Sequence, residues 1–237
     1  MNKVKKALLM TLCAGCLVVT TVFGTLAYLT DTDAVTNTFT VGSVYLKLDE
    51  TDVKPDGTLD TDNRVQENEY HLLPGHTYIK DPTVTVEAGS EESYVRMLVT
   101  LNNAAELKKI FGDNFLPQNY VKGWNNAVWQ TTGIVEEDAT ANTLTYEFRY
   151  VGDAHKGTKD GTVKKTDTNI SLGALFKEFT MPGKVTKEQL AILVTKDDAG
   201  NITERFTITV VAHAIQADGF DNADAAWKAF DEQILNQ

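Results

Sequence analysis

The chain has almost no cysteine. Its 237 residues include only Cys13 and Cys16, and both fall in an apolar stretch near the N-terminus. The sequence from Tyr28 onward therefore excludes disulfide bonds, thiol nucleophiles and thiolate metal sites. A chain of this length can bury roughly 70% of its unfolded surface, so it does not need such cross-links to fold.

Positive charge is also scarce. The chain has 22 Lys and Arg against 33 Asp and Glu, which gives a formal net charge of −11. A strongly acidic surface disfavours nucleic acid and anionic lipid as partners, because both repel it. We therefore expect no nucleic-acid partner and a soluble protein that binds cations loosely at most.

Motifs for catalysis are missing too. The sequence contains no H-E-x-x-H zinc motif, no G-x-S-x-G elbow, no Walker loop and no dinucleotide fingerprint. His71 and His76 flank a Leu-Leu-Pro-Gly turn, which favours two ordinary loop histidines over a metal site. The sequence thus predicts no enzyme and no catalytic residue.

An acidic, Asp- and Thr-rich segment over 49–69 predicts a solvated loop. Its Asp49–Asp62 part fails the EF-hand spacing, because Lys54 would take the third ligand position. A weak divalent-cation site in residues 49–62 remains the alternative, and no resident cofactor is expected.

The N-terminus has the layout of a secretory signal. Three lysines between residues 3 and 6 precede an uncharged apolar run over 7–23, and Thr25 and Ala27 supply the small residues that a signal peptidase reads. We predict a signal peptide over 1–27 and cleavage between Ala27 and Tyr28. The alternatives are an uncleaved anchor and, more weakly, a lipoprotein at Cys16. A cleaved signal and an uncleaved anchor both place the rest of the chain outside the cell, because the lysines stay on the cytoplasmic side.

Several segments alternate apolar and polar residues with a period of two, which is typical of half-buried strands. A phase slip at Gly42 predicts a bulge or a break in the first of them, and residues 172–181 fit either a strand or a helix. The predicted strands cover 36–48, 76–86, 93–101, 120–129, 131–136, 144–151 and 206–215.

Three segments favour helices. Residues 103–111 have helical apolar spacing and end at Gly112, and Thr186 with Gln189 forms a capping box for a short helix. Residues 223–235 have an amphipathic pattern. Strands still outnumber helices along the chain. The expected fold is mainly β: one antiparallel β-sandwich domain over 28–237 with a few short helices, including the C-terminal amphipathic one.

Residues 24–31, with the sequence GTLAYLTD, lead into Asn37-Thr38-Phe39 and then to Gly42 and Val44. This junction resembles the start of the camelysin/TasA family of secreted Gram-positive proteins. In that family a SipW-type signal peptidase cleaves before an aromatic residue, and an N-x-F-x-x-G-x-[VL] strand follows.

The resemblance implies a jelly-roll-like sandwich and a SipW-type signal peptidase as a partner. For TasA it implies a biofilm-matrix fibre in which the N-terminal strand of one subunit pairs into the sheet of the next. For camelysin it implies a cell-surface protein described as a metalloprotease, although the zinc motif is missing from this sequence.

Residues 28–48 suit strand exchange because they begin at a new chain end. Their apolar side chains would each contribute roughly 1.5–3 kcal/mol if fully buried in a neighbour. We expect a secreted structural protein of the matrix or cell surface that self-associates, with a camelysin-like protease and a monomeric binding or adhesion module as alternatives. The strand-exchange candidates are Phe39, Val41, Val44 and Leu46.

Overall fold

The structure is a computed structural model that describes residues 30–33, 43–54, 58–112, 120–152 and 161–235. The predicted signal peptide over 1–27, with its cleavage residues Ala27 and Tyr28, lies outside these ranges. Within them, no helix has the length and apolar character needed to cross a membrane.

The described chain folds mainly into antiparallel strands. The larger sheet has the order β1–β15–β6–β9–β8, and β10 pairs with β6. All of its pairings are antiparallel. Its members are β1 (Thr30–Asp33), β6 (Ser93–Asn102), β8 (Trp129–Asp138), β9 (Thr143–Tyr150), β10 (Thr162–Val163) and β15 (Ile208–Gln216).

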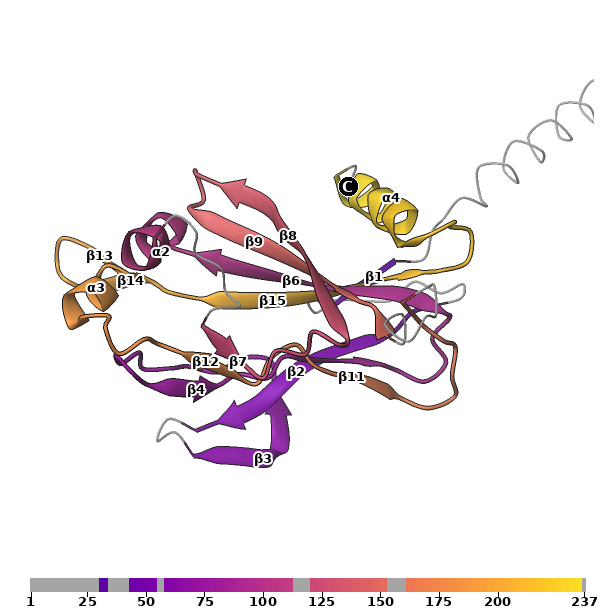
Figure 1. Ribbon diagram of the computed structural model, residues 1–237, viewed down its shortest axis with the longest axis horizontal. Coiled ribbons are helices and arrows are strands. Elements are labelled where there is room, and N and C mark those ends of the chain that lie inside the picture. The colour runs from indigo at the N-terminus through magenta and orange to yellow at the C-terminus, as the bar shows by residue number, and fades with distance from the viewer. Residues whose placement is uncertain (1–29, 34–42, 55–57, 113–119, 153–160, 236–237) are drawn as a thin grey trace, which may run out of the picture.

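A smaller sheet faces the larger one, with the order β11–β5–β2–β3 (Figure 1). The chain passes between the two layers from β5 to β6 and again from β10 to β11, so the sandwich has a jelly-roll-like plan. Its members are β2 (Leu46–Val53), β3 (Leu59–Val65), β5 (Thr83–Val86) and β11 (Ile170–Ala174).

Short pieces extend the two layers. One set pairs in the order β4–β12–β7, and β13 pairs with β14 as a hairpin. Their bounds are β4 (Thr77–Ile79), β7 (Val121–Lys122), β12 (Glu178–Thr180), β13 (Val194–Lys196) and β14 (Ile202–Arg205).

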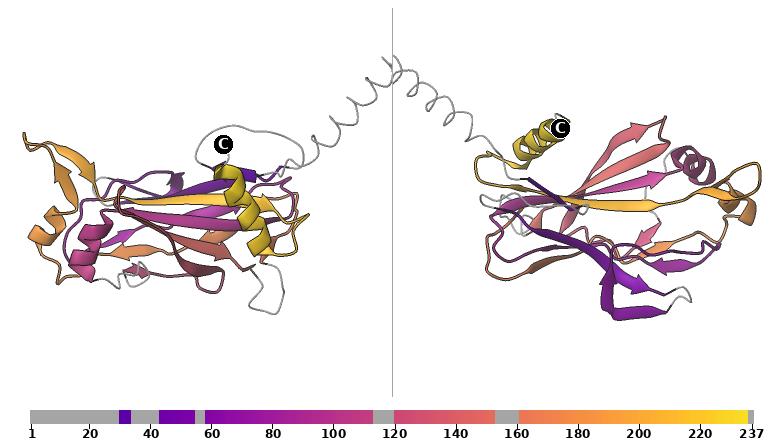
Figure 2. Two further views of the ribbon diagram at one scale, coloured as in Figure 1. Left: turned by 90° about the horizontal axis from the view of Figure 1, so that it is seen from above. Right: turned by 180° about the vertical axis from the view of Figure 1, so that it is seen from behind.

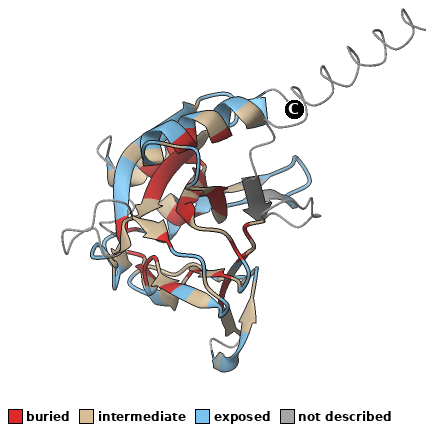
Figure 3. Cartoon of the chain, turned by 90° about the vertical axis from the view of Figure 1, so that its right-hand side faces the viewer, coloured by how far each residue is buried: buried red, intermediate tan, exposed pale blue. Residues whose placement is uncertain are grey.

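The core lies between the layers, where the apolar members of each alternating strand meet. Trp129, Leu144 and Met97 are fully buried there. Figure 3 shows the buried residues gathered in the strands and the exposed ones over the outer surfaces. The predicted antiparallel β-sandwich is therefore confirmed.

The helices also follow the sequence predictions. The structure has α2 (Ala104–Phe111), α3 (Lys187–Ala191) and α4 (Ala223–Leu235). Thr186 and Gln189 form the capping box at the start of α3, in which the Thr186 hydroxyl accepts from the Gln189 amide. Gly112 follows α2 with a φ of 93°, a backbone conformation that favours glycine.

Three sequence predictions were wrong in part. The segment 49–69 is not a loop, because β2 continues to Val53 and forms a hairpin with β3. The predicted strand 76–86 is two strands, β4 and β5, which join different sheets on either side of Pro82. The predicted strand 120–129 is strand only in β7 and at Trp129, where β8 begins. Residues 172–181, which fitted either a strand or a helix, contain the end of β11 and all of β12 and no helix.

Candidate functional site

The first described strand, β1, lies at an edge of the larger sheet. Among the described strands it pairs only with β15, in the register Thr30–Ile215, Asp31–Ala214, Thr32–His213 and Asp33–Ala212. The sequence predicted no strand before residue 36, because Thr-Asp-Thr-Asp over 30–33 has no alternation of apolar and polar residues. The β1–β15 pairing therefore lies close to the predicted cleavage point in the chain, and the sequence did not predict it.

The four strand-exchange candidates do not all lie in this edge. Phe39 and Val41 are outside the described residues. Val44 and Leu46 are buried in the sandwich core, with 3% and 7% of their surface exposed. Leu46 begins β2, which pairs with β5 on one side and β3 on the other. These two side chains are thus integral to the subunit's own core.

A buried cluster of charges occupies the outer face of the larger sheet, beside the β1 edge. Glu147 on β9, which is 2% exposed, accepts hydrogen bonds from Arg96 Nη1 at 3.1 Å and from Thr132 Oγ1 at 2.7 Å. Arg149 Nε lies 3.1 Å from the second Glu147 oxygen. The sequence shows polar residues on these strand faces but gives no sign that they meet.

His213 on β15 belongs to the same cluster. Its Nδ1 accepts a hydrogen bond from Arg96 Nε at 3.3 Å, which requires an unprotonated nitrogen. Burial, and then the adjacent Arg96 charge, lower the pKa of His213 to about 4, against the smaller opposing effects of Asp231 and Glu147. The neutral imidazole is therefore the form that the folded chain holds.

This pKa predicts an acid-sensitive fold. Because the folded-state pKa of His213 lies below the unfolded value, the unfolded chain binds the proton first as pH falls below about 6.5. Between pH 7 and pH 5, the unfolding free energy of the native chain should fall by about 2 kcal/mol more than that of a His213→Gln variant. Urea unfolding at both pH values measures this. The control His76→Gln, at an exposed histidine, should lose as much unfolding free energy as the native chain. If the His213→Gln variant also loses as much as the native chain, the lowered pKa of His213 is not the cause of the acid sensitivity.

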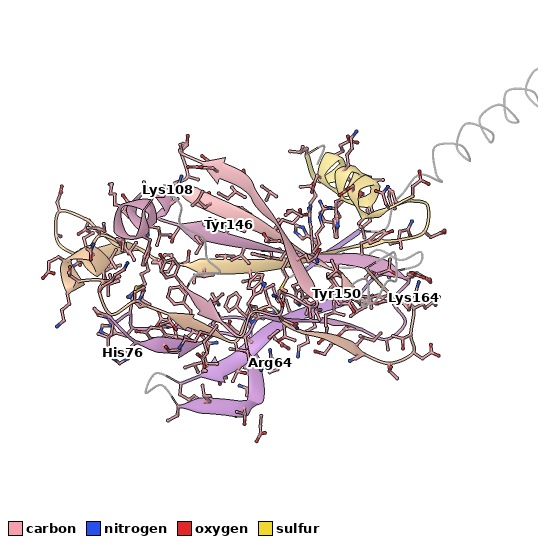
Figure 4. All side chains as sticks on the ribbon, viewed as in Figure 1. Arg64, His76, Lys108, Tyr146, Tyr150 and Lys164 are labelled. Carbon is pink, nitrogen blue, oxygen red and sulfur yellow. The ribbon has the colours of Figure 1, made fainter. Side chains whose placement is uncertain are left out.

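The β2–β3 hairpin holds most of the segment expected to be an acidic loop. Asp49 is 6% exposed and pairs with Arg64 and, at 2.8 Å, with Lys47. Figure 4 shows Arg64 where the hairpin leaves the sandwich. Asp52 pairs with Lys54, and that contact is the first cause of its lowered pKa. Asp49, Asp52 and Asp60, three of the carboxylates that suggested a cation site, therefore bind basic side chains of the same chain.

A shallow hollow of about 530 Å³ lies on the outer face of the smaller sheet, beside Lys47, Asp49, Arg64, Thr83 and Ser171. Its charged groups are already paired within the chain, since Asp49 bridges Lys47 and Arg64, and Asp81 also pairs with Arg64. This surface gives little support to a ligand-binding module.

His71 and His76, the two histidines that flank the Leu-Leu-Pro-Gly turn, lie in the segment before β4, and both contact Tyr78. His76 lies in the turn before β4, and its ring is 6.4 Å from that of Tyr78. Across the ranges that the structure describes, no three His, Cys, Asp or Glu side chains gather in a way that could hold a metal ion. The protease alternative therefore gains no support from these residues.

Comparison with known protein families, with curated proteins and with solved structures finds no match to this chain.

Proposed function

We propose that the protein is an exported structural subunit of the extracellular matrix or cell surface, which assembles head to tail into fibres by passing β1 to the β15 edge of the next subunit. The observation that carries the proposal is the position of β1. It is a short strand at a sheet edge that begins at Thr30, shortly after the predicted signal peptide, and among the described strands it is hydrogen-bonded only to β15. A SipW-type signal peptidase would release it.

The strand pairings favour β1 over β2 as the exchanged element. Removing β1 breaks one four-residue ladder, in which each hydrogen bond contributes about 1 kcal/mol net. Removing β2 together with the residues just before it would open two ladders and would take Val44 and Leu46 out of the core. The sequence predicted that residues 28–48 exchange between subunits, and the proposal limits the exchanged strand to residues within 28–33.

Exchange of β1 is also compatible with growth. The same ladder forms whether β1 comes from its own subunit or from a neighbour, so the hydrogen bonds made with the neighbour offset those broken within the subunit. Each subunit then gives one strand and accepts one. Such a head-to-tail contact forms an open fibre unless its rotation closes a ring.

Mixed single-cysteine variants test this pairing, because the protein from Tyr28 onward contains no cysteine. We would mix Asp31→Cys protein with Ala214→Cys protein and oxidise the mixture under fibre-forming conditions. Paired antiparallel positions have Cα atoms about 4.5–5.5 Å apart, within the range of a disulfide. Fibres should contain the mixed disulfide at high yield, measured by mass spectrometry of the linked peptides.

Two controls make the result specific. The Ala199→Cys variant places a thiol in the exposed turn between β13 and β14, far from the β1–β15 edge. Asp31→Cys protein mixed with Ala199→Cys protein should therefore give only background cross-linking. Deletion of residues 28–33 should abolish fibres in electron micrographs while the monomer stays folded. Normal fibres from the deletion variant would reject strand exchange, and a stable monomer under all conditions would favour the extracellular binding-module alternative.

A further inference from the structure

Helix α4 lies on the outer face of the larger sheet and is separate from the main core. Figures 1 and 2 show it across the end of the sheet where β1 and β15 run. Its buried side chains Ala226, Trp227 and Phe230 form a small cluster with Tyr94 and Ile215, apart from the apolar core between the sheets. The helix is thus held by a small apolar contact together with polar contacts to the sheet.

Two aspartates supply those polar contacts. Asp224 and Asp231 are seven residues apart, which places them on one face of α4. Asp231 accepts hydrogen bonds from both terminal nitrogens of Arg96, one of them at 3.2 Å. Asp224 pairs with Arg149. Each end of the helix is therefore tied to the sheet by an arginine–carboxylate pair.

The helix also brings negative charge to the arginines on the face of the sheet beneath it. On the sheet, Arg96 and Arg149 share the single carboxylate of Glu147, at 3.1 Å each. The two aspartates of α4 give each arginine a second carboxylate partner. The Arg96 guanidinium lies 4.5 Å from the centre of the Trp227 ring, so charge and apolar contact act at the same point.

Two of the residues that support α4, His213 and Ile215, also pair with β1. His213 stacks on Phe230 with ring centres 4.8 Å apart, and it lies opposite Thr32 in the β1 register. Ile215 is buried in the α4 cluster and lies opposite Thr30. One stretch of β15 thus carries the helix on its face and β1 along its edge.

We propose that α4 is a charge-held latch that keeps β1 paired within its own subunit, and that release of the helix speeds the exchange of β1. The latch is poised for release, because the Asp224 and Asp231 side chains are 85% and 52% exposed and solvent screens their ion pairs. The use of the latch in assembly rests on the proposed function. The physical coupling of α4 to the β1–β15 pairing does not depend on that function.

Hydrogen exchange on the monomer from Tyr28 onward tests the coupling. In a variant with Asp224→Asn and Asp231→Asn, amides in 30–33 and 212–216 should exchange about tenfold faster, as expected for the loss of two partly exposed ion pairs. Glu232→Gln is the matched control, since it also removes a carboxylate from α4 but one that pairs with Lys228 on the same helix. It should leave the exchange rates unchanged.

A milder variant guards against a general loss of structure. Asp224→Asn alone changes a mostly exposed side chain and should give a smaller increase confined to the same peptides. Amides in the β6–β9 ladder should keep their protection in every variant. Equal exchange in the latch variants and in Glu232→Gln would overturn the latch.

Fibre growth separates the latch from the proposed function. Faster growth in the double variant supports both. Faster β1 exchange without any fibres leaves the latch standing and rejects the proposed function. Fibres that grow at one rate in the double variant and in Glu232→Gln support the function and overturn the latch.

Discussion

Replacement of Glu147 by leucine is expected to lower the free energy of unfolding by about 3–5 kcal/mol. The carboxylate is 2% exposed and lies between Arg96 and Arg149, and Arg96 is itself only 5% exposed. Without Glu147, a buried guanidinium loses one of its carboxylate partners in a place that water does not reach. Chemical denaturation followed by circular dichroism measures the loss.

A double variant distinguishes this cause from lost packing. Arg96→Met combined with Glu147→Leu removes both buried charges, so it should cost less than the Glu147→Leu change alone. Arg96→Met also disconnects Asp231, so hydrogen exchange in α4 should rise in the double variant. Strictly additive losses would contradict the buried-charge explanation.

Replacement of Trp129 by alanine should cost about 3–5 kcal/mol, because it opens a large cavity in the main core. Trp129 is fully buried and packs edge-on against Tyr150, with ring centres 5.7 Å apart. Its indole Nε1 donates to the Gly173 carbonyl at 3.3 Å, so one side chain connects the two layers of the sandwich. The measurement is the midpoint and slope of global unfolding.

Trp227 provides the matched control, since it is also a buried tryptophan, with 2% of its surface exposed. It belongs to the α4 cluster and not to the main core. Trp227→Ala should therefore release α4 while the sandwich keeps a near-native unfolding midpoint. Equal global losses in the two variants would show that α4 and the sandwich unfold as one unit, contrary to the latch.

Local signals in the sequence were sufficient for several elements. The amphipathic stripe of 223–235 matches the bounds of α4, and the capping box at Thr186 forms as expected. The long alternating runs became β6, β9 and β15, the central strands of the larger sheet. These elements were predictable because neighbouring residues alone decide which face of each becomes apolar.

Other elements could not be predicted from local pattern. The β2–β3 hairpin is rich in Asp, which is depleted in strands. Arg64 holds it by contacts with Asp49, 15 residues earlier in the chain, and with Asp81, 17 residues later. Strand β1 has no apolar alternation at all, and its pairing partner lies about 180 residues further along the chain. Contacts over such separations leave no periodic trace in the sequence.

The sequence by itself determined the mainly β class, the helices and the expectation of an exported chain with no cysteine from Tyr28 onward. Only the tertiary structure decided which strand lies at the edge, that Val44 and Leu46 belong to the core, and that Arg96, Glu147 and His213 meet beneath α4. The physical reason is that periodicity reports the environment of a residue relative to its neighbours. Edge position and buried charge pairing depend on strand order and register, which the packing of distant segments sets.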